Sequence, residues 1–311
     1  MEYTGLYQKY TINRPLTRLE QEHGLDIHQK LDLPLAYQLA VIKINSTYLE
    51  LVDKYFRWKG VMSSVLLAIF YIVPIGCATI ALDFILIAIG ANSSPYYSPQ
   101  QAWTQTVLLL LFGPGLIGSI LIWLLRKEAF ALTHYPIRLN RKSRKIFAFQ
   151  PGGKIVEFDW DHSFFCLGLG KSNTWEIQGH KLDAEGKVSA TFAFSELAVG
   201  AKDRELLKQH WEFIRRYMEE GPTSVIQEVK ACLPIADQRE PFWFGLQRTA
   251  FYVSAMPWSM RLAFLLIYLI CYPGRWLAMR TSQVPAWPAN VDEQCQVAPD
   301  DPYSRDASMN P

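Results

Sequence analysis

The sequence has few cysteines, and none of them are closely spaced. Five occur in 311 residues, and no two form a C-x-x-C pair. Disulfides hold together small secreted domains in oxidising compartments, and closely spaced cysteine pairs bind zinc. We therefore expect unpaired thiols in a reducing compartment at all five positions, which are Cys77, Cys166, Cys232, Cys271 and Cys295.

The first 26 residues lack the apolar core of a cleavable signal peptide. Such a peptide has a basic start followed by 7–15 apolar residues, whereas this segment is polar and irregular. The first long apolar stretch begins only at residue 61. We therefore expect that stretch to be a retained membrane anchor.

Charged residues are nearly absent from two long stretches of the chain. Residues 61–90 contain one, Asp83, and residues 107–125 contain none. A membrane helix needs about 20 apolar residues. We predict a transmembrane hairpin over residues 60–127, with spans at about 61–83 and 107–125. Pro114 removes a backbone donor and favours a kink in the second span.

Lysine and arginine are missing from the loop between the predicted spans. Residues 90–105 contain neither, whereas Lys54 and Lys59 precede the first span and Arg126 and Lys127 follow the second. Basic residues near spans are retained on the cytoplasmic side. We expect a multi-pass membrane protein with the N-terminus and the main soluble domain in the cytoplasm; if the host is a Gram-negative bacterium, the membrane is the bacterial inner membrane. Asp83 then lies near the outer surface; a proton or ion relay is the alternative.

Aromatic and basic residues alternate just before the first predicted span. Tyr55, Phe56 and Trp58 are interleaved with Arg57 and neighbouring lysines. Amphipathic aromatic rings and cations are enriched at the headgroup level of membranes. We therefore predict that residues 55–58 anchor the chain at the membrane surface. Residues 33–58 carry apolar side chains at helical spacing, so we expect residues 1–59 to be an N-terminal cytoplasmic helical segment.

Residues 130–222 combine a strand pattern with one amphipathic helix. Alternating apolar positions and turn residues predict strands at 136–139, 145–149, 155–158, 164–169, 174–180 and 188–194. Residues 201–220 follow as a helix with an apolar stripe that includes Leu207, Trp211, Ile214 and Met218. The fold class is therefore an α+β membrane protein, with a cytoplasmic antiparallel β domain closed by a C-terminal helix. This order resembles a pleckstrin-homology-like layout.

The last 89 residues give weaker signals. Residues 223–280 are mixed, and the apolar run at 262–272 is short for a span. We predict an interfacial or protein-packed helix over residues 261–280, with a third span as the alternative. Residues 281–311 contain five prolines and several acids, which predicts a disordered tail.

Short motifs for chemistry are weak or absent. Gly170-Lys171-Ser172 resembles the end of a phosphate loop, but the required earlier glycine is Phe165. Asp159, Asp161 and His162 could approach a metal ion, yet solvated acids at a strand end are the commoner case. No G-x-S-x-G occurs, and the histidines are scattered. We therefore expect no catalytic residues, cofactor or metal, and no nucleic-acid partner.

A basic cluster follows the second predicted span. Its residues within the soluble domain are Arg138, Arg141, Lys142, Arg144 and Lys145. Basic residues just inside a membrane are attracted to anionic lipid by about 1 kcal/mol each. We predict that these five residues contact the lipid bilayer or a partner protein, while Arg126 and Lys127 set the topology.

Three stretches carry a family resemblance. HYPIRLNRKSRKIFAFQPGG (134–153), VEFDWD (156–161) and STYLELVDKYFRWKG (46–60) resemble an uncharacterised bacterial family of two-span membrane proteins, often encoded near type VI secretion effector genes. The resemblance implies a setting near secretion effectors rather than a mechanism, and in that setting we expect a non-enzymatic protein that acts through protein contacts. Its partner would be a cognate effector or a secretion component, and its role immunity or effector loading. A lipid-sensing module and a membrane-bound hydrolase are the alternatives.

Overall fold

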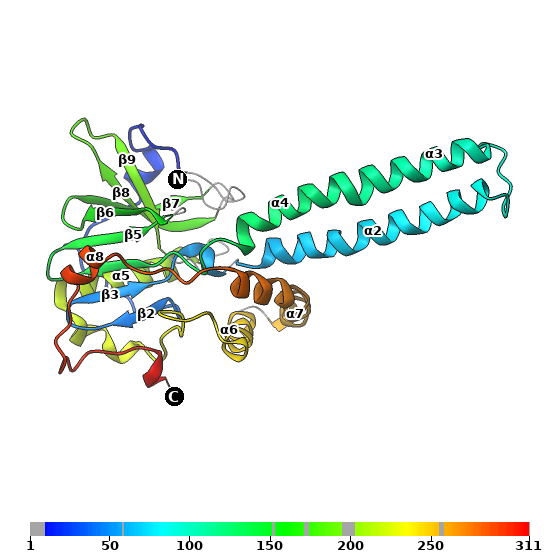
Figure 1. Cartoon of the computed structure of the whole chain (residues 1–311). Coiled ribbons are helices and arrows are strands. Elements are labelled where there is room, and N and C mark those ends of the chain that lie inside the picture. Colours follow the sequence, from blue (N-terminus) through cyan, green and yellow to red (C-terminus); the bar gives the residue numbers. More distant parts are fainter. Residues whose placement is uncertain are drawn as a thin grey trace. The chain divides into compact units, whose positions relative to one another are not determined.

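The computed structural model describes residues 10–310, except residues 58, 151–152, 171–173, 195–202 and 255–257. The chain divides into two compact units. The sheet unit comprises Met1–Arg57, Leu132–Phe244 and Gln283–Pro311, and the helical unit comprises Trp58–Ala131 and Gly245–Ser282. The protein is α+β, with two antiparallel sheets and several helices (Figure 1).

The larger sheet has five antiparallel strands in chain order. They are β2 (Val41–Ile44), β3 (Tyr48–Leu51), β4 (Ile137–Asn140), β5 (Lys145–Phe149) and β6 (Ile155–Asp159). Strands β3 and β4 pair directly, with Glu50 opposite Arg138. Because neighbouring strands are normally joined by short loops, residues 58–131 of the helical unit are a long insertion between two paired strands.

The smaller sheet has the strand order β1, β7, β8 and β9. These strands are Gly24–Leu25, Ser163–Leu169, Trp175–Leu182 and Val188–Ala193, and a short helix, α1 (Arg18–Glu22), precedes the first of them. All six strands predicted from residue 136 onwards are present, with ends shifted by at most two residues. Alternation and turn chemistry were reliable here because the turns at 140–145 and 182–188 are local.

The prediction of helices between residues 33 and 58 is wrong. The segment contains strands β2 and β3, joined by a tight turn in which the Asn45 side chain accepts the N–H groups of Thr47 and Tyr48. Only a 3₁₀ turn, η1 (Lys54–Arg57), follows. All four β3 residues are buried because both faces of this sheet are covered. The alternation of apolar and polar residues that marks a half-buried strand is therefore not visible in this part of the sequence.

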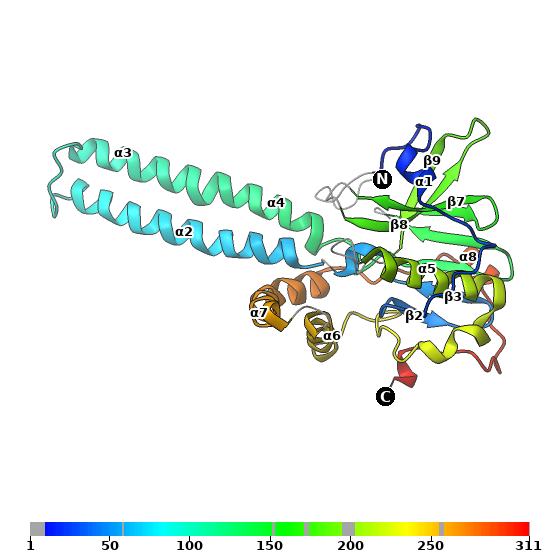
Figure 2. The ribbon, with the colours of Figure 1, turned by 180° about the vertical axis from the view of Figure 1, so that it is seen from behind.

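Helix α5 (Asp203–Glu220) carries the predicted apolar stripe. Leu207, Trp211, Ile214 and Met218 are all buried, as expected. Trp160 is also buried, and its ring stacks on that of Trp211 with centroids 5.6 Å apart. Its indole N–H donates to Glu219, 2.7 Å away. The helix thus packs on the domain through aromatic contacts and several polar contacts. Figure 2 shows α5 from behind.

The prediction of a disordered tail after residue 280 is wrong. Residues 283–310 pack on the sheet unit and include α8 (Ala289–Gln294) and the 3₁₀ turn η6 (Ala307–Met309). Asp301 accepts the backbone and side-chain donors of Ser46 at 2.8 Å each, and Arg305 exchanges backbone hydrogen bonds with Ile44. Proline and acid content suggested disorder, but these acids receive specific donors and α8 buries Val291.

The helical unit contains a pair of long apolar helical segments. One is α2 (Val61–Ala88); the other runs through α3 (Pro99–Leu110), a π-helical stretch η2 (Leu111–Ile117) and α4 (Gly118–Ala129). The two segments lie side by side in both views (Figures 1 and 2). The π-helical stretch surrounds Pro114, where a missing N–H disturbs regular α-helical bonding.

A third apolar helix, α7 (Trp258–Thr281), belongs to the same unit and is longer than predicted. It follows α6 (Phe242–Ser254). Among the described residues, three helices are long and apolar enough to cross a membrane: the one containing α2, the α3–α4 segment, and α7. The alternative of a third span therefore stays open.

A buried glutamate fixes the beginning of α2. Glu128 accepts the backbone N–H groups of Gly60 and Ser63 at 3.0 and 2.6 Å, and the Ser63 hydroxyl at 2.6 Å. The first N–H groups of a helix have no partner within it, and the N-terminal end of the helix dipole favours an anion. Glu128 therefore joins the end of α4 to the start of α2.

Candidate functional site

Strand register places a row of alternating charges across the larger sheet. Lys43 on β2 faces Glu50 on β3, Glu50 faces Arg138 on β4, and Arg138 faces Phe147 on β5. Residues directly opposite in an antiparallel pair share one face, with Cβ atoms about 5 Å apart. The three charged side chains thus lie in line on the sheet face that the C-terminal segment covers.

Arg138 is the centre of this row. Its side chain is 5% exposed, and it contacts Glu50 at 2.8 Å and Asp292 of α8 at 2.7 Å. The rings of Tyr48 and Trp287 lie 4.4 and 4.5 Å from its guanidinium carbon. Burial alone would lower the pKa of Arg138, but the charge of Glu50, the neighbouring Tyr48 and the hydrogen bonds to Asp292 and Glu50 together outweigh burial and raise the pKa above its ordinary value.

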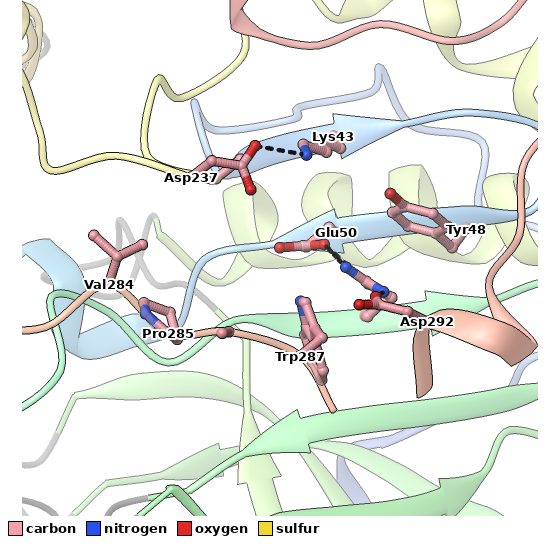
Figure 3. A pocket seen from close by; sticks show the side chains of 11 residues that line it. Lys43, Tyr48, Glu50, Asp237, Val284, Pro285, Trp287 and Asp292 are labelled. Carbon is pink, nitrogen blue, oxygen red and sulfur yellow. Dashed lines mark hydrogen bonds and ion pairs between the residues drawn. The ribbon is translucent and has the colours of Figure 1, made fainter. Parts of the chain in front are cut away.

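A pocket of about 450 Å³ opens on this row of charges (Figure 3). The sheet provides the polar side of its lining, and residues 284–287 with Asp292 provide a wall from the C-terminal segment. The lining residues are Lys43, Tyr48, Glu50, Arg138, Ala236, Asp237, Val284, Pro285, Ala286, Trp287 and Asp292. This volume falls within the range of ligand pockets. We take it as the candidate functional site.

A family model describes most of the chain that builds this pocket. It is the model of a family of unknown function, DUF6708, and it matches residues 115–299, more than half of the chain. The chain belongs to the DUF6708 family. Arg138, Trp287 and Asp292 lie inside the matched region, whereas Lys43 and Glu50 precede it. No curated protein and no solved structure matches the chain.

The predicted basic cluster is dispersed in this DUF6708 protein. Arg138 points into the folded unit and is buried, so its assignment as a lipid contact is wrong. Arg144 contacts Asp161 and, at 2.7 Å, Glu219. Lys145 lies 2.8 Å from Glu157. Three of the five cations are thus held by carboxylates of the same chain.

The other two cations differ in exposure. Lys142 is exposed at the tip of the β4–β5 turn. Arg141 is half-buried, and its side chain donates to the carbonyl of Ser46 at 3.4 Å. A contact of the turn with lipid or a partner remains a prediction, and it now depends mainly on Lys142.

The predicted membrane-surface anchors are largely enclosed. Phe56 is buried, with its ring 6.1 Å from that of His134, so its assignment as a headgroup anchor is wrong. Tyr55 and Arg57 are half-buried. The Lys54 ammonium lies over the Tyr55 ring, 4.8 Å from the ring centroid. Trp58 lies outside the described residues.

A cysteine and a histidine meet inside the sheet unit, a pair that the sequence did not reveal. The sulfur of Cys166 lies 3.5 Å from Nε2 of His180, and Glu20 lies 3.6 Å from the same nitrogen. Both Cys166 and His180 are 0% exposed. Burial raises the pKa of the Cys166 thiol, and a reactive cysteine needs the opposite shift together with access. The pair therefore has the geometry of a nucleophile and its base, but the buried Cys166 thiol does not ionise as a nucleophile must.

The weaker motifs do not assemble into a site within the described residues. Asp159 and His162 contact each other at 2.9 Å, and the described part of the chain contains no group of three or more metal-ligating side chains. Gly170 directly follows strand β7, while Lys171 and Ser172 lie outside the described residues. The five cysteines are all free, as predicted.

Acidification below pH 6.5 is expected to destabilise the sheet unit because two histidines are buried in their neutral form. Burial lowers the pKa values of both His180 and His210 from 6.5 to about 4. Between these pH values the folded state binds fewer protons than the unfolded chain, so stability is full above pH 6.5 and falls towards pH 4. Each histidine accounts for a loss of about 3 kcal/mol at the acidic end.

The measurement is the unfolding temperature of the full chain in detergent at pH 7.5, 6 and 5. Replacing the buried His210 with Asn, which can still donate to the Ala36 carbonyl, should flatten the dependence. His162→Gln is the matched control, since that side chain is 86% exposed. An unfolding temperature that does not change between pH 7.5 and 5 would show that these histidines are not buried as described.

Proposed function

We propose that this protein is a membrane-anchored, non-enzymatic binding protein that acts through contacts between its sheet unit and a partner protein. The observation that carries the proposal is the pocket: it lies in a folded unit whose charges are fixed in pairs, on a chain that also contains three apolar helices of membrane-spanning length. The helices would hold the protein in a bacterial inner membrane, and the sheet unit would lie in the cytoplasm.

The more specific proposal is immunity against a type VI secretion effector. It rests on the resemblance of residues 46–60, 134–153 and 156–161 to a bacterial family found near effector genes. An immunity protein needs a preformed surface that binds its toxin, and a pocket with buried, mutually fixed charges supplies rigid polar groups for such recognition. Loading of an effector before export is the alternative within the same class.

The two other functional classes have less support. Lipid sensing was predicted from the basic cluster, but Arg138, Arg144 and Lys145 are paired with acids. The order of antiparallel strands followed by α5 is compatible with a pleckstrin-homology-like layout, and this too is a hypothesis. A hydrolase would need an accessible nucleophile, which the buried Cys166 does not provide.

The test is a competition between strains of the natural host. A strain that lacks this gene and the adjacent effector gene should lose viability when it is attacked by its parent. Complementation with the full chain should restore survival. An attacker without a functional secretion system is the control and should not kill. Survival of the deletion strain would refute immunity, whereas loss of effector export from a strain that keeps the effector gene and lacks only this gene would indicate loading.

A further inference from the structure

One carboxylate oxygen of Glu50 has no donor from the described part of the protein and is accessible in the pocket. Glu50 is 3% exposed. Its Oε2 accepts a hydrogen bond from Nε of Arg138 at 2.9 Å and lies 2.8 Å from Nη2 of the same guanidinium. Within the described residues, no hydrogen-bond donor reaches Oε1. Figure 3 shows one Glu50 oxygen joined by a dashed line to its ion-pair partner and the other oxygen pointing towards the side of Val284. A carboxylate oxygen that is open to the pocket can accept a charge-assisted hydrogen bond from a ligand, which is stronger than a bond between neutral groups.

The charges of the lining favour a cation. Three carboxylates and two cations line the pocket, and both cations already have acidic partners: Lys43 contacts Asp237 at 3.1 Å, and Arg138 contacts Glu50 and Asp292. Asp237 is 85% exposed, so its carboxylate can also meet an incoming group. An anionic ligand would add to this excess of negative charge, whereas a cation would neutralise it.

Apolar and aromatic side chains complete the lining. Val284, Pro285 and Trp287 form the wall from the C-terminal segment. An aliphatic stem can pack on such a wall, and the indole of Trp287 already lies beside one guanidinium, that of Arg138. Lysine and arginine side chains have this combination of an aliphatic stem and a charged donor.

We propose that the pocket binds an arginine or lysine side chain of a partner protein, with its charged group donating to Oε1 of Glu50 and its stem packed against Val284 and Pro285. A volume of about 450 Å³ accommodates one such side chain with part of its backbone. The proposal rests on the proposed function only for the source of the side chain. A free guanidinium or ammonium compound would use the same contacts.

The test is calorimetric titration of the full chain in detergent micelles with Nα-acetyl-arginine amide. The matched control ligand is Nα-acetyl-citrulline amide, which has nearly the same shape without the charge. The arginine derivative should bind about ten-fold more tightly, the difference expected for one charged hydrogen bond. Nα-acetyl-lysine amide should bind in the same range. Equal affinity for the arginine and citrulline compounds would overturn the proposal, as would the absence of binding.

Two variants locate the binding. Glu50→Gln should abolish the preference for arginine over citrulline. Because that change also removes the charge that neutralises Arg138, Ala286→Phe serves as a second variant that leaves every charge in place and narrows the pocket. It should weaken binding about ten-fold, as expected when the space for a well-packed side chain is lost. Asn290→Phe, on α8 and outside the lining, is the matched control. Unchanged binding in Ala286→Phe would place the ligand elsewhere.

The outcomes for the pocket and for the proposed function are separable. Binding of the arginine derivative together with survival of the deletion strain would support a cation site and refute immunity. Killing of that strain together with equal binding of arginine and citrulline would support immunity and refute the cation site. A basic partner is supported when exchanging one arginine of the cognate effector for glutamine weakens its binding to the wild-type chain but not to Ala286→Phe.

Discussion

Replacement of Arg138 by Met is expected to lower the free energy of unfolding of the sheet unit by about 3–5 kcal/mol. Met keeps much of the side-chain volume but removes the charge between Glu50 and Asp292. Glu50 then remains buried without a counter-ion, which is far less favourable than a paired carboxylate. Asp292 is 58% exposed and can be solvated by water, so the loss arises mainly from Glu50.

A double variant separates the charge from the packing. The double variant Glu50→Leu/Arg138→Met leaves no buried charge unpaired. Its free energy of unfolding should therefore recover most of the loss seen in Arg138→Met. Lys142→Met is the matched control, because that side chain is exposed and the change should stay within about 0.5 kcal/mol. Thermal and denaturant unfolding followed by circular dichroism give the comparison. A double variant as unstable as Arg138→Met would contradict the role of the unpaired carboxylate.

Replacement of Gly274 by Ala is expected to disrupt the contact between α7 and α2. A Cβ atom on Gly274 would lie 2.0 Å from Oγ and 2.4 Å from the backbone nitrogen of Ser64. Backbone atoms cannot move aside as the end of a side chain can, so the two helices must separate. We expect a loss of about 1–3 kcal/mol or more, the range for overpacking of a tight interior.

A second glycine in the same unit offers a control for this change. Around Gly76, on α2, no atom lies within 4 Å of the added Cβ, so Gly76→Ala should be neutral or slightly stabilising. The measurement is the temperature at which the full chain unfolds or aggregates in detergent. Equal behaviour of the two alanine variants would mean that α7 and α2 do not pack as closely as described.

The sequence predicted those elements whose pattern depends on local information. The strands from residue 137 onwards and helix α5 have turns, alternation or a helical stripe that can be read directly. Strands β2 and β3 lacked visible alternation because both of their faces are buried. Strand β4, the partner of β3, also lies far along the chain, so no short turn in the sequence indicated that these two strands pair.

The candidate site could not be predicted from residue types. Arg138 belongs to a run of basic residues, and nothing local distinguishes it from the exposed Lys142. Its burial depends on the register of β3 with β4 and on the cover provided by Trp287 and Asp292. That cover comes from a proline-rich segment whose composition suggested disorder. Alternation along β4 places Arg138 on the opposite face from Ile137 and Leu139, which by itself suggests an exposed side chain.

The insertion of a helical unit between β3 and β4 links the two parts of the proposal. Each end of the insertion leads directly into a strand of the larger sheet, and Glu50 and Arg138 lie on these two strands. The pocket therefore stands on strands that connect to the apolar helices.

The most direct test of a membrane-anchored binding protein is the accessibility of two exposed positions in bacterial cells. Asn92→Cys lies in the loop between α2 and α3, and Lys142→Cys lies in the sheet unit. The unsubstituted chain, with its five native cysteines, gives the background. With a membrane-impermeant maleimide, we predict labelling of position 92 in spheroplasts and labelling of position 142 only after permeabilisation. Equal labelling of both positions in intact spheroplasts would contradict the account.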